Sequence, residues 1–188
     1  MKSTEDYQYQ IVAFSPKEEH PSPNDILKIS LNQFVHKITA ESAHTISCEF
    51  TLPNLKREKV MMISIPDITR TYDGLTDVDF YFLFIYLQNN NAQKDFELIC
   101  SYMKKYCDLN KKIYVFGILK DDFFQKKITK EDIKKFLEEN EMKFKYYEIN
   151  LKDEKKIGDI ILNILLAFSQ KRENKANIGQ QAHSCVFF

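Results

Sequence analysis

The last four residues of the chain carry the clearest group for covalent chemistry. Cys185-Val186-Phe187-Phe188 matches the C-a-a-X pattern, in which the cysteine thiol receives a prenyl group. A terminal phenylalanine favours geranylgeranyl transfer, and one such chain anchors a protein to a membrane only weakly and reversibly. We therefore expect lipidation at Cys185 and peripheral membrane contact through this tail, with an unmodified cysteine as the alternative.

The other cysteines and the histidines are scattered along the sequence. They are Cys48, Cys100, Cys107, His20, His36, His44 and His183. None of them has the spacing of a metal site, and the sequence contains no CxxC, HExxH or nucleophile-elbow pattern. We expect no metal ion and no catalytic residue. The three cysteines stand among apolar positions, which predicts reduced thiols in the core of a cytoplasmic protein.

Length and composition favour one folded domain. The 188 residues are 44% hydrophobic and 13% aromatic, and a net charge of zero gives no general attraction to nucleic acid. The polar N-terminus predicts no signal peptide, and no apolar run approaches the roughly 20 residues that span a bilayer. We expect a domain over residues 1–170 and a flexible tail over residues 171–188, where helical periodicity ends.

Strand-like segments alternate with segments at helical spacing almost to the end of the chain. The expected strands cover residues 11–14, 44–52, 60–65, 80–87, 113–118 and 144–149. The expected helices cover residues 24–38, 96–107, 129–137 and 153–168. Asn24 or Asp25 is the expected cap of the first helix, and Thr129 with Asp132 has the spacing of a capping box.

This alternation predicts an α/β fold with a mostly parallel six-stranded sheet between two layers of helices. Residues 80–87 are apolar throughout and rich in aromatics, which is typical of a central strand covered on both faces. Residues 44–52 instead alternate polar and apolar side chains, as in a half-exposed strand. Together with residues 60–65 they predict an antiparallel hairpin, which supplies one antiparallel edge strand.

This order of elements, with a hairpin after the first helix, resembles the Ras/Rab family of small GTPases. Residues 78–99 (VDFYFLFIYLQNNNAQKDFELI) are similar to that family's fourth strand and third helix. Residues 111–122 (KKIYVFGILKDD) resemble its fifth strand, and residues 142–165 (MKFKYYEINLKDEKKIGDIILNIL) its sixth strand and last helix. The resemblance implies a Ras-like, P-loop-NTPase-like fold over most of the chain.

The phosphate-binding loop of that family has no counterpart in the sequence. The GxxxxGK[ST] motif uses glycines to wrap backbone N–H groups around phosphates. The corresponding residues 15–28 read SPKEEHPSPNDILK, and no glycine precedes Gly74. Three prolines there lack N–H groups, and Glu18, Glu19 and Asp25 would repel a triphosphate. The next motif, DxxG, is also missing, because Asp67 is not followed by glycine three positions later.

The guanine-binding motifs survive only in part. Residues 118–121 align with NKxD and retain only Asp121, and residues 150–152 align with SAK and retain only Lys152. The resemblance implies that Asp121 and Lys152 are vestigial nucleotide-binding residues. A receiver-like α/β fold, with Asp67 and Lys120 at strand ends, is a further alternative, but it would have no hairpin.

The sequence therefore predicts a non-catalytic pseudo-GTPase that acts as a protein-binding module or assembly subunit. The resemblance to Rab proteins implies a role in vesicle or ciliary trafficking, without a cofactor and with protein partners that the sequence does not identify. The alternative is an atypical small GTPase. It would bind GTP or GDP with Mg²⁺ weakly through Asp121 and Lys152 and act as a membrane-anchored switch.

Overall fold

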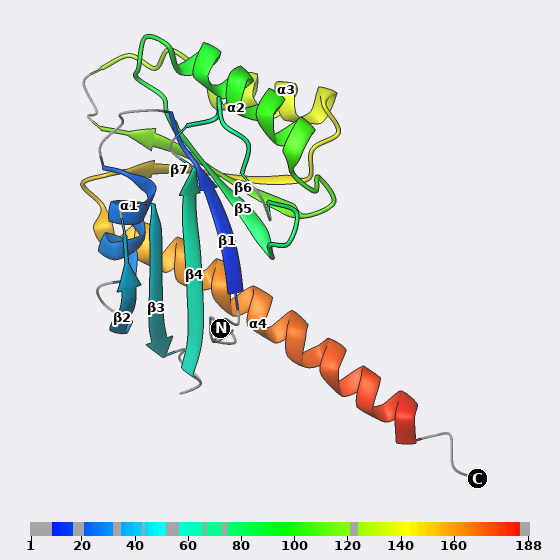
Figure 1. The fold of residues 1–188 in the computed structure, drawn as a ribbon. Helices are drawn as coiled ribbons and strands as arrows, with labels where there is room; N and C mark the ends of the chain where they lie inside the picture. The colour runs from blue at the N-terminus through cyan, green and yellow to red at the C-terminus, as the bar shows by residue number, and fades with distance from the viewer. Residues whose placement is uncertain are drawn as a thin grey trace.

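Seven strands form one sheet in the part of the chain that the computed structural model describes (Figure 1). The described residues are 9–16, 21–31, 35–42, 44–51, 57–65, 67–72, 75–120 and 124–184. The strands are β1 (Tyr9–Phe14), β2 (Val35–Glu41), β3 (Thr45–Thr51), β4 (Arg57–Ile65), β5 (Phe80–Tyr86), β6 (Lys112–Leu119) and β7 (Phe144–Asn150). The helices are α1 (Pro23–Leu31), α2 (Ala92–Tyr106), α3 (Lys130–Glu139) and α4 (Glu154–Ser184).

The strands lie in the order β2-β3-β4-β1-β5-β6-β7. From β4 to β7 each strand pairs in parallel with its neighbour, whereas β3 pairs antiparallel with both β2 and β4. Every residue of β5 is buried. This explains its uninterrupted apolar sequence, because a central parallel strand is covered on both faces. The expected α/β fold with a mostly parallel sheet is confirmed.

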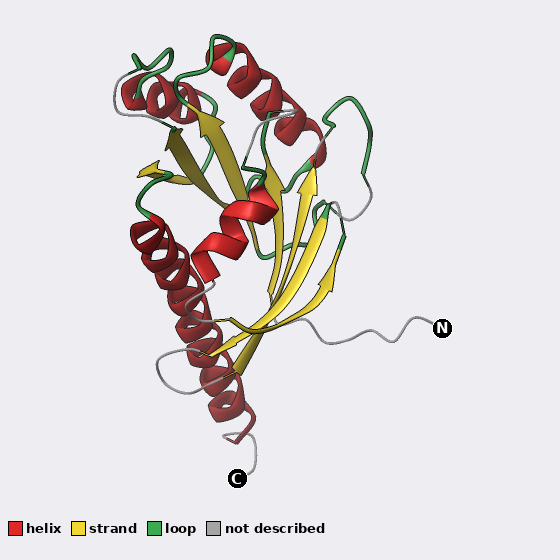
Figure 2. Ribbon diagram, turned by 90° about the vertical axis from the view of Figure 1, so that its left-hand side faces the viewer, coloured by secondary structure: helices red, strands yellow, loops and turns green. Residues whose placement is uncertain are grey.

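Two hydrophobic clusters separate the faces of the sheet. On one face, Phe80, Phe82 and Phe84 belong to the cluster that includes the apolar residues of α1 and α4. On the other face, Tyr81 and Leu83 belong to the cluster that includes α2 and α3. Helices α1 and α4 lie side by side over the first face (Figure 2). The expected three layers are therefore present.

The region after α1 differs from the sequence prediction. A helix was expected as far as Ile38, but α1 ends at Leu31 and residues 35–41 form β2. Strand β2 pairs with β3, with Ile38 opposite Cys48. The sheet therefore has seven strands rather than six, and β3 is an internal strand rather than the antiparallel edge. Helical spacing of apolar residues did not exclude a strand, because β-branched side chains such as Ile38 and Thr39 also suit a sheet once a partner strand is available.

Helix α4 is longer than the sequence predicted. Residues 171–184, expected as a flexible tail, continue the helix to Ser184. The segment contains no proline and is rich in Lys, Arg, Glu, Gln and Ala, which have high helix propensity even without apolar periodicity. Figure 1 shows α4 crossing the sheet and extending past it. Within the described residues, neither α4 nor another helix has the length and apolar character needed to cross a membrane.

Candidate functional site

The N-terminus of α1 lies at the carboxyl edge of the parallel strands, just after β1. Pro23 is the first helical residue and has no N–H to offer. The Ser22 backbone N–H and hydroxyl both donate to Asp25 Oδ2, at 3.0 and 2.7 Å, and the Asp25 N–H donates to Ser22 Oγ at 3.3 Å. This is a reciprocal capping box. The cap is thus Ser22, rather than Asn24 or Asp25 as predicted, and a carboxylate of the chain itself occupies the positive end of the helix.

Buried polar contacts anchor the start of α1 to the sheet. The Ser64 hydroxyl at the end of β4 donates to Asn24 Oδ1 at 2.7 Å. The Tyr86 hydroxyl at the end of β5 donates to the carbonyl oxygen of Pro21. The ring of Tyr86 is buried, and Lys120 Nζ lies 4.8 Å from its centroid. Side chains of β4 and β5 therefore hold the start of α1 against the strand edge.

Lys28, the lysine of α1 nearest to the cap, is paired within the protein. Its ammonium group forms a hydrogen bond and ion pair with Glu41 at the end of β2. This hydrogen bond raises the pKa of Lys28 above its usual value. Lys17, Glu18 and Glu19, which the sequence placed in the same region, lie outside the described residues.

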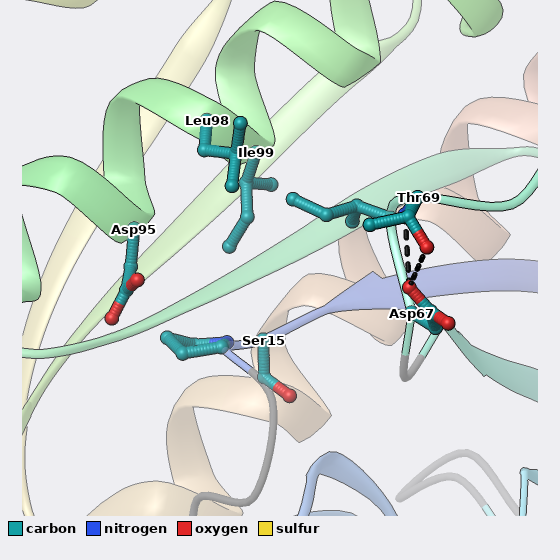
Figure 3. A pocket seen from close by; sticks show the side chains of 8 residues that line it. Ser15, Asp67, Thr69, Asp95, Leu98 and Ile99 are labelled. Atoms are coloured by element: carbon teal, nitrogen blue, oxygen red, sulfur yellow. Dashed lines mark hydrogen bonds between the residues drawn. The ribbon is translucent and has the colours of Figure 1, made fainter.

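Asp67 organises the turn that follows β4. Its Oδ1 accepts hydrogen bonds from the Thr69 backbone N–H at 2.9 Å and from the Thr69 hydroxyl at 2.6 Å (Figure 3). Its Oδ2 lies 3.4 Å from Nε of Arg70. The carboxylate therefore stabilises its own loop, in the manner of an Asx turn.

A pocket of about 160 Å³ lies between this turn, the end of β1 and α2 (Figure 3). Its lining combines apolar and acidic side chains. The lining residues are Ser15, Pro16, Asp67, Ile68, Thr69, Asp95, Leu98 and Ile99. The pocket could not be predicted from the sequence, because its walls come from three segments that only the fold brings together. Leu98 is an apolar residue outside the buried stripe of α2. Its position in the sequence was the signal that could have indicated an apolar surface here.

The connection between β4 and β5, residues 66–79, forms turns without a helix in its described part. Two tyrosines from other elements hold it in place. The Tyr102 hydroxyl on α2 donates to the Arg70 carbonyl at 2.9 Å, and the Tyr81 hydroxyl on β5 donates to the Leu75 carbonyl at 2.5 Å. The Tyr81 hydroxyl also accepts from the Asp108 N–H at 3.0 Å, and burial raises the pKa of Tyr81 above its usual value. The connection is therefore tied to both neighbouring elements.

The predicted guanine-side residues follow neighbouring strands. Leu119 at the end of β6 is in register with Asn150 at the end of β7. Lys152 is exposed two residues later, and its backbone N–H donates to Asn150 Oδ1 at 2.9 Å. Asp121 and the lipidation candidate Cys185 lie outside the described residues. The structure therefore locates Lys152 alone among the three predicted site residues.

Comparisons with known proteins do not assign the chain to a family. No protein-family model matches the chain, and no curated protein matches it. Among the described residues, no three His, Cys, Asp or Glu side chains are grouped so that they could hold a metal ion. Within the described residues, the capped helix, the anchored connection and the pocket are the features that bear on function.

Proposed function

We propose that this chain is a Ras-like pseudo-GTPase, a protein-binding module that does not bind guanine nucleotide. The strand order supports the Ras-like assignment, since β1 lies at the centre of parallel strands and an antiparallel pair follows α1. The extra edge strand β2 is a departure from the pattern that the resemblance implied. A role as an assembly subunit in vesicle or ciliary trafficking is supported by the resemblance of residues 78–165 to Rab proteins.

The observation that carries the proposal is the capping of α1 by Ser22 and Asp25. P-loop proteins bind phosphate at the N-terminus of the helix after the first strand, where free backbone N–H groups and the helix dipole favour an anion. In this chain the N–H groups of Ser22 and Asp25 are hydrogen-bonded to the capping side chains, and Pro23 has none. The Asp25 carboxylate would also repel phosphate at short range.

The pocket and the anchored connection support the same proposal. A volume of about 160 Å³ is well below the roughly 300 Å³ at which small-molecule sites begin. In a GTPase switch, the segment after the corresponding strand reorders when the γ-phosphate is bound or released. Here the Tyr81 and Tyr102 hydrogen bonds already hold that segment. The connection therefore offers a partner a single preformed surface.

The proposal is tested by titrating the purified full chain with fluorescent GDP and GTP in the presence of Mg²⁺. We expect no saturable change in fluorescence at micromolar protein and nucleotide. A dissociation constant in the micromolar range or below would contradict the proposal, because it would show a functional phosphate and base site.

Such binding would favour the alternative, an atypical small GTPase. In that case Asp121→Ala and Lys152→Ala should each weaken nucleotide binding, as the guanine-side alignment implies. The matched control is Lys156→Ala, which removes an exposed lysine from the first turns of α4. Equal effects of Lys152→Ala and Lys156→Ala would exclude a specific role for Lys152.

A further inference from the structure

The pocket between α2 and the β4–β5 connection has an apolar wall that is open to solvent. Leu98 is 52% exposed, whereas its neighbour Ile99 is buried. Both contribute to the lining together with Ile68 and Pro16. Figure 3 shows Leu98 and Ile99 on α2 facing the turn of Asp67 and Thr69. An apolar group that enters here would cover Leu98 and remove more apolar area from water.

The volume of the pocket matches one side chain. A cavity of about 150 Å³ with apolar walls is known to hold benzene. The 160 Å³ available here is therefore adequate for a leucine, methionine or phenylalanine side chain. It is too small for a nucleotide or a typical cofactor.

Hydrogen bonds within the chain hold the turn that forms one wall of the pocket. The turn that carries Ile68 and Thr69 is held from within by Asp67 and from α2 by Tyr102, which bonds the Arg70 carbonyl. Preorganisation of this kind lowers the entropy cost that a partner must offset when it binds. The pocket is therefore already formed before a partner binds, which suits it to docking.

The acidic side chains in the lining favour an apolar partner that also carries a positive charge. Asp67 and Asp95 contribute carboxylates on two sides of the opening, and no lysine or arginine is among the described lining residues. Arg70 offsets part of the Asp67 charge, but it is 77% exposed and lies outside the lining. Residues 1–100, which supply the whole pocket, carry 9 basic and 14 acidic side chains. A basic group beside the apolar side chain would therefore complement the site.

We propose that this pocket is a docking site for a segment of a partner protein that presents one bulky apolar side chain with a lysine or arginine next to it. The inference rests on the proposed protein-binding function and specifies its contact surface. Leu98 and Ile99 receive the apolar side chain, and Asp95 with Asp67 attracts the cation.

Three capped tripeptides serve as probes in an NMR titration of the isotope-labelled full chain. They are acetyl-Lys-Phe-Lys-amide, acetyl-Glu-Phe-Glu-amide and acetyl-Lys-Ala-Lys-amide. We expect Lys-Phe-Lys to shift the methyl signals of Ile68, Leu98 and Ile99 in a saturable way. The acidic peptide should bind at least about fivefold more weakly, because its charges repel the lining. The alanine peptide should produce no saturable shift, since it lacks the anchoring ring.

Two matched pairs of variants locate the contact. Asp95→Asn should weaken Lys-Phe-Lys binding about two- to fivefold, as expected for one solvent-accessible ion pair, whereas Asp159→Asn on exposed α4 should not. Leu98→Ser should weaken binding about threefold or more, whereas Ile38→Ser, at the similarly exposed Ile38 of β2, should not.

Equal binding of the acidic and basic peptides would overturn the inference, and so would shifts confined to other surfaces or no saturable shift up to about 10 mM. Addition of GDP to the same sample reports on the proposed function separately. Nucleotide binding with intact peptide shifts would overturn only the proposed function. If neither nucleotide binding nor peptide-induced shifts are observed, only the proposed docking site is overturned.

Discussion

Burial determines the chemistry of the three cysteines that the structure describes. Cys48 and Cys100 are fully buried on opposite faces of the sheet, and Cys107 is partly buried after α2. Burial raises the pKa of each thiol from 9.0 to about 12. These thiols are therefore protonated at physiological pH and are poor nucleophiles, as expected for small core residues.

The raised pKa of Cys100 makes a testable contribution to stability at alkaline pH. A folded-state pKa above the unfolded value means that the unfolded chain loses its proton first, so stability falls as pH rises above about 9. Between pH 8 and pH 10 this costs the native protein roughly 1 kcal/mol per buried thiol. Urea unfolding under reducing conditions should therefore show a loss of stability between these pH values that is roughly 1 kcal/mol smaller in Cys100→Ala than in the native sequence.

The neighbouring Ser101→Ala variant is the control for this measurement, because the serine is exposed and does not titrate. It should lose as much stability between the two pH values as the native protein. An equal loss in Cys100→Ala would show that the thiol ionises as readily in the folded protein as in the unfolded chain.

At the scale of elements, the β4–β5 connection and α1 form the candidate site, and side-chain hydrogen bonds hold both of them in place. The connection has no helix in its described part, and hydrogen bonds from α2 and β5 hold its backbone carbonyls. Helix α1 is held by its own capping box and by the hydrogen bond that Ser64 of β4 donates to Asn24. Both elements are anchored by side chains that a nucleotide-driven switch would have to release.

Removal of one of these hydrogen bonds should loosen the connection. Tyr102→Phe deletes the hydroxyl that donates to the Arg70 carbonyl and leaves the ring in place. We expect the free energy of unfolding to fall by about 1 kcal/mol, as for a typical intramolecular hydrogen bond. Amide hydrogen exchange should become faster in residues 67–72.

Tyr114→Phe is the matched control, since Tyr114 is also 6% exposed but lies on the opposite face of the sheet. It should leave exchange in residues 67–72 unchanged. The anchoring role of Tyr102 would be contradicted if both variants changed exchange there equally or if neither did.

At the scale of the whole molecule, α4 connects the domain to its C-terminus. Its described contacts with the sheet include Phe168, whose ring lies 5.0 Å from that of Phe80, and the buried Ser169, whose hydroxyl donates to Glu58 at 3.1 Å. The helix then continues to Ser184, beyond the edge of the sheet (Figure 1). Residue 185 follows at once, so a lipid on Cys185 would be joined to the domain through a helical spacer.

We propose that Cys185 is prenylated, as its C-a-a-X context predicts. Mass spectrometry of protein purified from eukaryotic cells should find one prenyl group on Cys185, and Cys185→Ser should abolish this modification. Because one chain anchors weakly, the modified protein should distribute between membrane and soluble fractions. An unmodified C-terminal peptide from such cells would refute the proposal.

Local sequence patterns correctly predicted elements whose structure depends on their own residues. The apolar run of β5 indicated a strand covered on both faces, and the capping box of Thr129 and Asp132 marked the start of α3; the structure confirms both. The segment at Ile38 was assigned wrongly, because apolar residues at helical spacing also occur in a strand once β3 is beside it. Local sequence does not contain the hydrogen-bonding partner that decides between the two.

The amino-acid sequence by itself determined the α/β class, the covered central strands and the absence of a glycine-rich phosphate loop. These properties depend on composition and on periodicity within one segment. Only the tertiary structure decided that Asp25 caps α1, that Tyr81 and Tyr102 hold the β4–β5 connection, and that Leu98 faces Asp67 across a pocket. The contacts of Tyr102 and Leu98 join residues far apart in the chain, and their distances are set by the packing of α2 on the sheet. The Tyr81 hydrogen bond is closer in sequence and depends on how the connection folds back onto β5. The cap itself depends on where the chain enters the helix, which the anchoring of Pro21 by Tyr86 constrains.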